Sequence, residues 1–202
     1  MFLKPSVDEV HAFLARESAL LVHFSGVPRG VPAGPERIFP EDLQFVIAGG
    51  AQTGVSCSVV RATDRFHGKP RNSIGAIGVV LDVITPESLI AVGPSDVGSH
   101  IVDGRRVAIE SDITVEDLEN SLRLRTEHNE WVVRDFIVGS IFAVDPLEYF
   151  DRRQDPPYCY TTLPELAAMF PGRPIIHVKA GQVSIHNPAQ SQHKDKACTA
   201  IE

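Results

Sequence analysis

The sequence predicts an α+β domain with mostly antiparallel sheets, two or three helices and a C-terminal extension. Several apolar runs have the length and the β-branched composition of strands. Few helical segments separate these runs, so the crossover helices that parallel neighbours require are largely missing. Asp103–Gly104, between two β-prone runs, is a hairpin signal. Together these features favour antiparallel pairing of neighbouring strands.

The helices are indicated by their end signals. Ser6 and Glu9 have the spacing of a capping box before an apolar stripe, which predicts a helix from about Val7 to Glu17. Pro40 precedes an acidic first turn, and Gly49–Gly50 ends that second helix. Two further segments have helical spacing, "TVEDLENSLRLR" and the short "TLPELAAMF" of the C-terminal part.

Strands are expected at 19–24 and 55–61. The nearly continuous apolar run "AIGVVLDVI" predicts a central strand buried on both faces, and "SLIAVGPSD" predicts the next. "EWVVRDFIVGSIFAVD" indicates two strands with a turn or bulge at Gly139, and "GRPIIHVKAGQVSIH" a small strand pair. We expect a main domain over 1–150, an extension over 151–186 packed on it, and a disordered polar tail over 187–202.

Composition narrows the function classes. The chain has 202 residues, 43% of them hydrophobic, and a net charge of −7 that disfavours non-specific nucleic-acid binding. Three scattered cysteines predict neither a disulfide framework nor a metal site. We find no secretory signal and no apolar run approaching the roughly 18 residues of a membrane helix. We therefore expect a cytoplasmic protein without a metal, and its oligomeric state stays open.

Polar side chains mark the ends of three predicted strands. His23 and Ser25 lie where the first strand opens into the long Pro/Gly-rich loop 25–39, and loops of that length are often functional. Ser56 and Ser58 share one face of the second strand by alternation. Glu130 begins the apolar strand "WVVRDF", where a carboxylate can face a cationic or hydroxyl-bearing ligand.

A strand ending in His, a strand with an S-x-S triplet and a strand opening with Glu together resemble the motif order of the ADP-ribosyltransferase superfamily. The resemblance spans roughly residues 19–144 and implies a split β-sheet with NAD held in a cleft. It implies that His23, with Ser25 beside it, anchors a ribose and that Ser56 and Ser58 line the floor. Glu130 would be the catalytic carboxylate that stabilises the transition state while ADP-ribose passes to a macromolecular acceptor.

This chain departs from the family pattern at two positions. Phe66 stands in the loop where many members place a tyrosine against nicotinamide, so the resemblance assigns that contact to Phe66. His128 occupies the position, two residues before Glu130, where members that modify targets often carry Gln or Glu. The acceptor is therefore left open.

A second reading is a non-catalytic protein-interaction module. It would use the Pro/Gly-rich loop or the aromatic C-terminal segment with Tyr149, Phe150, Tyr158 and Tyr160. In that reading the role of His23 is structural, and it holds the loop that follows its own strand in place. Three other sets of residues have commoner structural explanations. Cys57 is expected to be a buried small hydrophobic residue, and the basic loop with Arg61, Arg65, Lys69 and Arg71 is expected to be a solvated surface. The spacings of a third set match no compact zinc site: His177, His186, His193 and Cys198.

Overall fold

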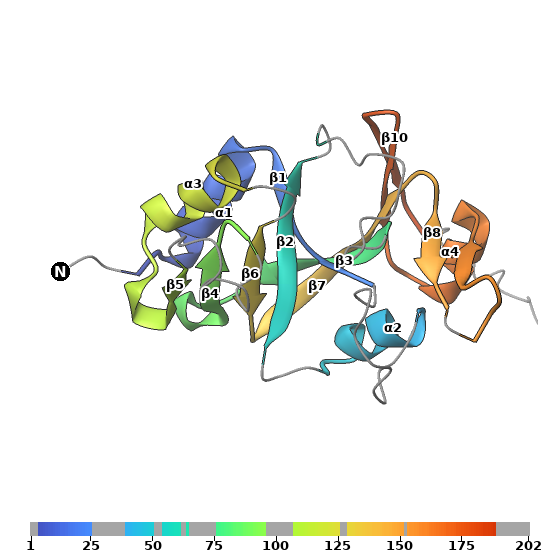
Figure 1. Ribbon diagram of the computed structural model, residues 1–202, viewed down its shortest axis with the longest axis horizontal. Coiled ribbons are helices and arrows are strands. Elements are labelled where there is room, and N and C mark those ends of the chain that lie inside the picture. The colour runs from blue at the N-terminus through green and yellow to red at the C-terminus, as the bar shows by residue number, and fades with distance from the viewer. Residues whose placement is uncertain are drawn as a thin grey trace, which may run out of the picture.

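The computed structural model describes residues 4–25, 39–50, 54–61, 64, 76–95, 107–125, 129–151 and 153–188. It has the predicted α+β class, with a nine-stranded mixed sheet, a separate two-stranded sheet and four α-helices among the described residues (Figure 1). The helices are α1 (Val7–Arg16), α2 (Glu41–Ile47), α3 (Val115–Arg123) and α4 (Leu163–Met169), with short 3₁₀ turns at Pro86–Ser88 and Glu110–Asp112. Three α-helices therefore belong to the first 150 residues, and the fourth belongs to the C-terminal segment.

Capping boxes begin three of the helices. Ser6 and Glu9 satisfy each other's backbone N–H groups at α1, as the sequence predicts. The same reciprocal bonds begin α3 at Thr114 and α4 at Thr162. Each pair satisfies donors that the first helical turn leaves without partners, so local sequence determines where these helices start.

The main sheet has the strand order β11-β10-β7-β3-β1-β2-β6-β4-β5. All of its pairings are antiparallel except that of β10 with β7. Two further strands, β8 and β9, pair with each other. The strands are β1 (Ala19–Phe24), β2 (Val55–Arg61), β3 (Ile77–Val83), β4 (Leu89–Gly93), β5 (Ala108–Ile109), β6 (Glu130–Val133), β7 (Phe136–Val144), β8 (Glu148–Phe150), β9 (Tyr158–Tyr160), β10 (Ile175–Lys179) and β11 (Gln182–His186).

The break between β6 and β7 does not fall at Gly139, the position of the predicted turn or bulge. It falls at Arg134–Asp135, where Asp135 has a φ of 47°, a conformation that a short polar residue adopts more readily than most. Gly139 lies inside β7, next to a register shift that places an extra β7 residue opposite β3. The glycine therefore marks a bulge, and the turn is made by Asp135. The predicted hairpin at Asp103–Gly104 lies outside the described residues.

The sheet bends around its own core. β6 runs into β7 after two residues, yet β6 pairs with β2 and β4 whereas β7 pairs with β3 and β10. β3 and β4 make the matching bend through the 3₁₀ turn. Ser88 joins the two bends, because its carbonyl accepts the Arg134 N–H at 2.9 Å and its hydroxyl donates to the Asp135 carbonyl at 2.8 Å.

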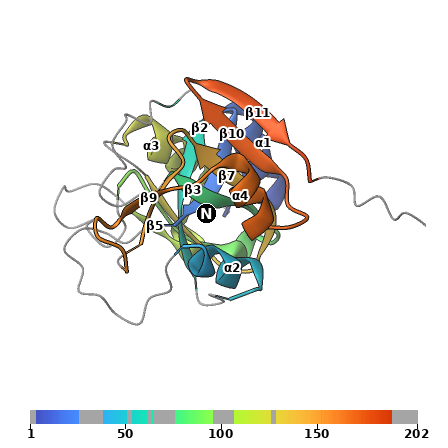
Figure 2. The same ribbon diagram turned by 90° about the vertical axis from the view of Figure 1, so that its right-hand side faces the viewer.

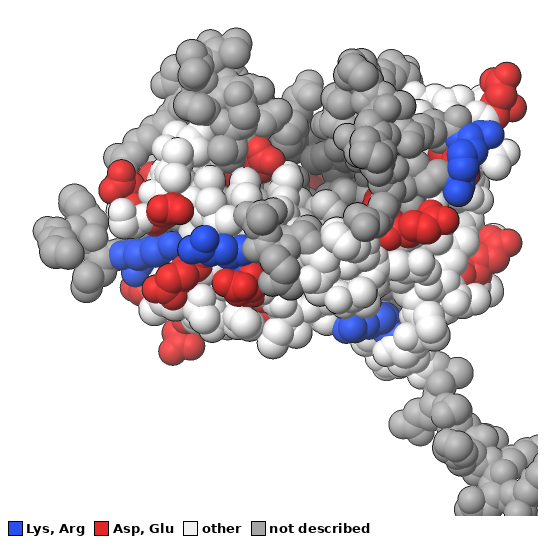
Figure 3. Space-filling model, turned by 90° about the horizontal axis from the view of Figure 1, so that it is seen from below, with Lys and Arg blue, Asp and Glu red and all other residues white. Residues whose placement is uncertain are grey.

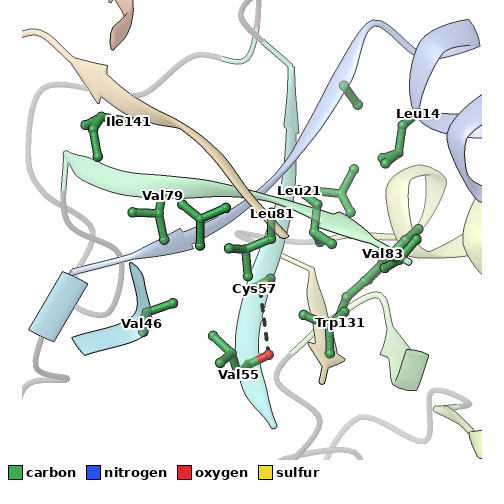
Figure 4. Packing of buried hydrophobic residues seen from close by; sticks show 14 of the residues in the cluster. Leu14, Leu21, Val46, Val55, Cys57, Val79, Leu81, Val83, Trp131 and Ile141 are labelled. Carbon is green, nitrogen blue, oxygen red and sulfur yellow. Dashed lines mark hydrogen bonds between the residues drawn. The ribbon is translucent and has the colours of Figure 1, made fainter. Parts of the chain in front are cut away.

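The concave side of this bend holds the larger apolar cluster. Figure 4 shows side chains from different strands packed together there, among them Leu21, Leu81 and Trp131. Helices close the cluster: Phe13 of α1 stacks on Trp131 at 5.9 Å between ring centroids, and Trp131 Nε1–H donates to Ser121 of α3 at 2.9 Å. Helix α2 adds Leu43 and Val46 from another side (Figure 1).

A second, smaller cluster lies on the opposite face of the same strands. Adjacent residues alternate between the two clusters, as Leu21 and Val22 do on β1 and Val79 and Val80 do on β3. The buried members are Val22, Val60, Val80, Phe142, Val144 and Val178, all from strands. As predicted, β3 is buried on both faces of the sheet, and this explains why its sequence is almost wholly apolar.

The C-terminal segment adds strands directly to the main sheet. Ile175–Val178 pair in parallel with Ile141–Val144, and His177 Nε2 bonds Asp145 Oδ1 at 2.7 Å. The predicted pair of strands at 172–186 is confirmed as the hairpin of β10 and β11. Most of the tail predicted to be disordered, residues 189–202, lies outside the described residues.

Gly78→Ala should destabilise the fold, because β1 and β3 approach closely there. A Cβ at Gly78 would lie 2.5 Å from the His23 carbonyl oxygen and 2.7 Å from Val22 Cγ1. Overpacking against backbone predicts a loss of about 1–3 kcal/mol in the free energy of unfolding, measured by urea denaturation. Gly139→Ala is the control, because its nearest atom would be 3.6 Å away. Equal losses in both variants would contradict this account.

Candidate functional site

The candidate site lies where β1 and β2 separate. The two strands pair only over Ala19–Val22 and Ser58–Arg61. Beyond Val22, β1 continues along β3 alone, and before Ser58, β2 continues along β6 alone. The sheet therefore divides at His23 and Cys57.

The imidazole of His23 lies where the two strands begin to separate. Its Nδ1 lies 2.7 Å from the carbonyl oxygen of Ser56, which has lost β1 as a strand partner. Because a carbonyl only accepts, Nδ1 carries the proton and Nε2 is the acceptor of the neutral ring. Burial lowers the pKa of His23, while the Ser56 carbonyl and the charge of Asp42 act to raise it. Burial is the larger effect, so the ring is neutral near pH 7.

Ser56 also contacts Glu130. The Ser56 hydroxyl donates to Glu130 Oε1 across the β2–β6 pair. Cys57 pairs with Trp131, so Ser56 and Glu130 are diagonal neighbours on one sheet face. Glu130 is half-buried and is followed by the fully buried Trp131, which holds the start of β6 against the core. The structure thus brings Ser56 and Glu130 together.

His23 and Glu130 reach Ser56 from different sides. Val22 pairs with Ser58, so alternation places His23 on the face of Cys57 and places Glu130 with Ser56 on the other face. Their link is Ser56, whose carbonyl bonds the histidine and whose hydroxyl bonds the carboxylate.

Ser58 and Asn129 support the strand that carries Glu130. Ser58 is buried, and its hydroxyl donates to the Asn129 carbonyl at 3.1 Å. The Asn129 side chain accepts the Val59 N–H at 2.7 Å and donates to the Val59 carbonyl at 3.2 Å. Its amide therefore takes the place of a strand residue beside β2. Sequence reasoning missed Asn129, because a polar residue before a strand is typical of a loop.

Ser25 is held by Asp42, a residue that sequence analysis read only as a helix N-terminal acid. The buried Ser25 hydroxyl donates to Asp42 Oδ2, and its N–H donates to the Ile77 carbonyl at 2.9 Å. Burial raises the pKa of Asp42, while the bonds from Ser25 and the Leu43 N–H act to lower it. Asp42 thus joins the end of β1 to the first turn of α2, and its charge acts on His23.

Some predicted site features lie outside the described residues: Phe66, His128 and most of the loops 25–39 and 62–72. Cys57 is buried, as expected of a small hydrophobic residue, and burial raises the pKa of its thiol well above the usual value. Arg61 of the basic loop is paired with Glu17.

The remaining histidine cluster is small. His177 and His186 have ring centroids 5.9 Å apart, and His193 and Cys198 lie outside the described residues. Within the described ranges no three His, Cys, Asp or Glu side chains gather as metal ligands, and no helix is long and apolar enough to cross a membrane.

On the face seen from below, acidic side chains stand at several places among the described residues, including the margins of that face (Figure 3). Basic side chains on this face stand in small groups, the largest a short row bordered by acidic residues. Comparison of the chain with family models, curated proteins and solved structures finds no significant match.

The lowered pKa of His23 makes stability depend on pH in the weakly acidic range. Between about 6.5 and the lowered pKa, the unfolded chain binds a proton that the folded protein does not. The free energy of unfolding should therefore fall as pH falls through this window, by at most about 1.4 kcal/mol per pH unit for one proton.

His23→Gln should remove this component, so its pH dependence should be flatter than that of the wild type. Urea denaturation between pH 5 and 7.5 measures the difference. His11→Gln changes an exposed histidine of α1 and serves as the control. Identical pH profiles for wild type and His23→Gln would show that the His23 imidazole does not cause the pH dependence of stability.

Proposed function

We propose that this protein binds NAD and acts as an ADP-ribosyltransferase on a macromolecular, most simply protein, acceptor. The observation that carries the proposal is the dual use of Ser56 where β1 and β2 separate. Its carbonyl orients His23 and its hydroxyl orients Glu130. Three residues far apart in the chain are thus linked through Ser56 where β1 and β2 separate, in the motif order of the family that the sequence resembles.

The chemistry of these groups fits a nicotinamide ribose. The neutral His23 ring offers Nε2 as an acceptor for a ribose hydroxyl, since Nδ1–H is used by Ser56. A carboxylate at Glu130 can accept a hydroxyl and stabilise positive charge that develops on the sugar. Bound NAD would supply nicotinamide as the leaving group.

The transfer exchanges one bond for another. The bond between the ribose carbon and nicotinamide breaks, and its electron pair leaves with nicotinamide. An acceptor nucleophile forms the new bond to that carbon and loses its proton. Glu130 is the catalytic residue in this proposal, because it lies at the start of β6 in contact with Ser56.

The serines divide into two groups. The Ser25 and Ser58 hydroxyls are engaged with Asp42 and with the Asn129 carbonyl. Besides the NAD contacts that the resemblance implies for them, they support β1 and β6. Ser56 alone among the three contacts the catalytic carboxylate.

A protein-interaction module is the second candidate, favoured by one observation. Tyr158 and Tyr160 of β9 are 38% and 64% exposed, and Tyr158 packs edge-on against Phe150 of β8 at 5.9 Å. Exposed aromatic side chains are common at protein interfaces. In this reading β8 and β9 contact a partner, and the polar cluster at Ser56 is structural.

Thermal melting with NAD, followed by an assay of nicotinamide release, tests the proposal. At tenfold excess over its Kd, NAD should raise the wild-type melting temperature by about 3–6 °C. His23→Ala should lose this shift. Glu130→Gln should keep it but release nicotinamide at least about 100-fold more slowly, because a neutral amide stabilises positive charge poorly.

Glu116→Gln, on the exposed side of α3, is the matched control and should behave as wild type in both measurements. If NAD neither stabilises the wild-type protein nor yields nicotinamide, the proposal is wrong, and the interaction module becomes the working hypothesis. A Glu130→Gln variant with wild-type release would remove Glu130 from the catalytic role.

A further inference from the structure

Within the part of the chain that the structure describes, strand β11 forms one edge of the main sheet. It is outermost in the strand order, and among the described elements it pairs only with β10 (Figure 2). Exposed edges usually carry a lysine, a proline or a bulge that prevents pairing with another chain. Gln182–His186 has none of these, and its five residues keep regular register with β10.

The side chains of β11 continue an apolar face of the sheet. Val183 and Ile185 are 50% and 64% exposed, although both are β-branched hydrophobic residues. They pair with Val178 and Ile176, which belong to or pack against the smaller apolar cluster. That apolar face therefore extends to the margin of the sheet and ends there in exposed side chains.

The turn before β11 determines which backbone groups point outward. Ala180 and Gly181 have φ values of 50° and 77°, as in a type I′ two-residue hairpin. In such a hairpin the flanking residues, Lys179 and Gln182, form a hydrogen-bonded pair. Hydrogen-bonded pairs alternate, so Gln182, Ser184 and His186 direct their backbone groups to β10. Val183 and Ile185 direct theirs to the free edge.

We propose that β11 pairs with β11 of a second copy of this chain, antiparallel and with the two-fold axis at Ser184. The segment reads polar, β-branched, polar, β-branched, polar, and so has the same pattern in both directions. Val183 of one copy then lies opposite Ile185 of the other. A two-fold interface requires this self-complementarity, because the same patch serves both copies.

Backbone and side chains select the same register. Opposing Val183 with Ile185 brings outward-pointing backbone groups together and joins the apolar faces of the two copies. A one-residue slip would oppose an outward residue to an inward one and would set apolar side chains on the polar face. The antiparallel register around Ser184 also uses all five residues of the strand.

Charge favours this edge for contact between copies. The chain carries a net charge of −7, so two copies repel each other over most approaches. Strand β11 has no Asp, Glu, Lys or Arg. His186, its only titratable residue, bonds Ser184 at 3.1 Å and lies near the His177 ring. The two copies therefore meet along a neutral strip.

Sedimentation equilibrium of the full chain over about 1–200 μM tests the contact. We expect the apparent mass to rise toward twice that of one chain for the wild type. Ile185→Lys should remain monomeric, because it places charge in the pairing strip of both copies, and its melting temperature should stay within about 2 °C of wild type.

Ile109→Lys is the matched control. Ile109 is 51% exposed and lies on β5 at the opposite edge of the same sheet. It should dimerise as wild type does. A wild-type protein that is monomeric throughout, or a dimer that survives Ile185→Lys, overturns the proposal.

Disulfide trapping tests the register, in a chain carrying Cys159→Ser and Cys198→Ser. Across the two-fold axis the Ser184 positions form a non-hydrogen-bonded pair with Cα atoms about 4.5 Å apart, within disulfide range. Ser184→Cys should therefore form a covalent dimer under mild oxidation. Gln182→Cys should not, because its two copies lie about 13 Å apart in this register. Trapping at 182 and not at 184 would overturn it.

Discussion

The structure depends on the double bend at Ser88. This buried serine accepts from Arg134 and donates to Asp135, so the turn between β3 and β4 and the turn between β6 and β7 hold each other. Since each pair of consecutive strands changes neighbours at its bend, the sheet wraps around a single interior. Trp131, Leu81 and the helices then fill that interior, and burial of this apolar surface supplies the main stabilisation.

The same bend creates the candidate site. Once β2 follows β6 and β1 follows β3, the two strands separate beyond Val22 and Ser58. Separation leaves backbone groups of both strands without a strand partner, and other groups have to bond them. His23 supplies a donor to Ser56, and Asn129 supplies both a donor and an acceptor to Val59. The polar cluster is thus the consequence of a sheet that divides.

This origin has two consequences for function. An imidazole and a carboxylate placed at a division in a sheet have fixed positions, because each bonds the same serine. Rigid placement is a general requirement of sites that bind or transform small molecules. At the far edge of the sheet no such constraint acts on β11, whose outward backbone groups are those of Val183 and Ile185. The two surfaces therefore offer different chemistry, since one is polar and the other is apolar.

The sequence by itself determined the helix starts at Ser6 and Thr114, the strands at 19–24 and 55–61, and the face shared by Ser56 and Ser58. These follow from capping and from side-chain alternation, which act within a few residues. Only the tertiary structure decided that Ser56 contacts Glu130, that Asp42 holds Ser25, and that β10 joins β7. Strand order depends on contacts between residues far apart in the chain, and local patterns do not encode which strands become neighbours.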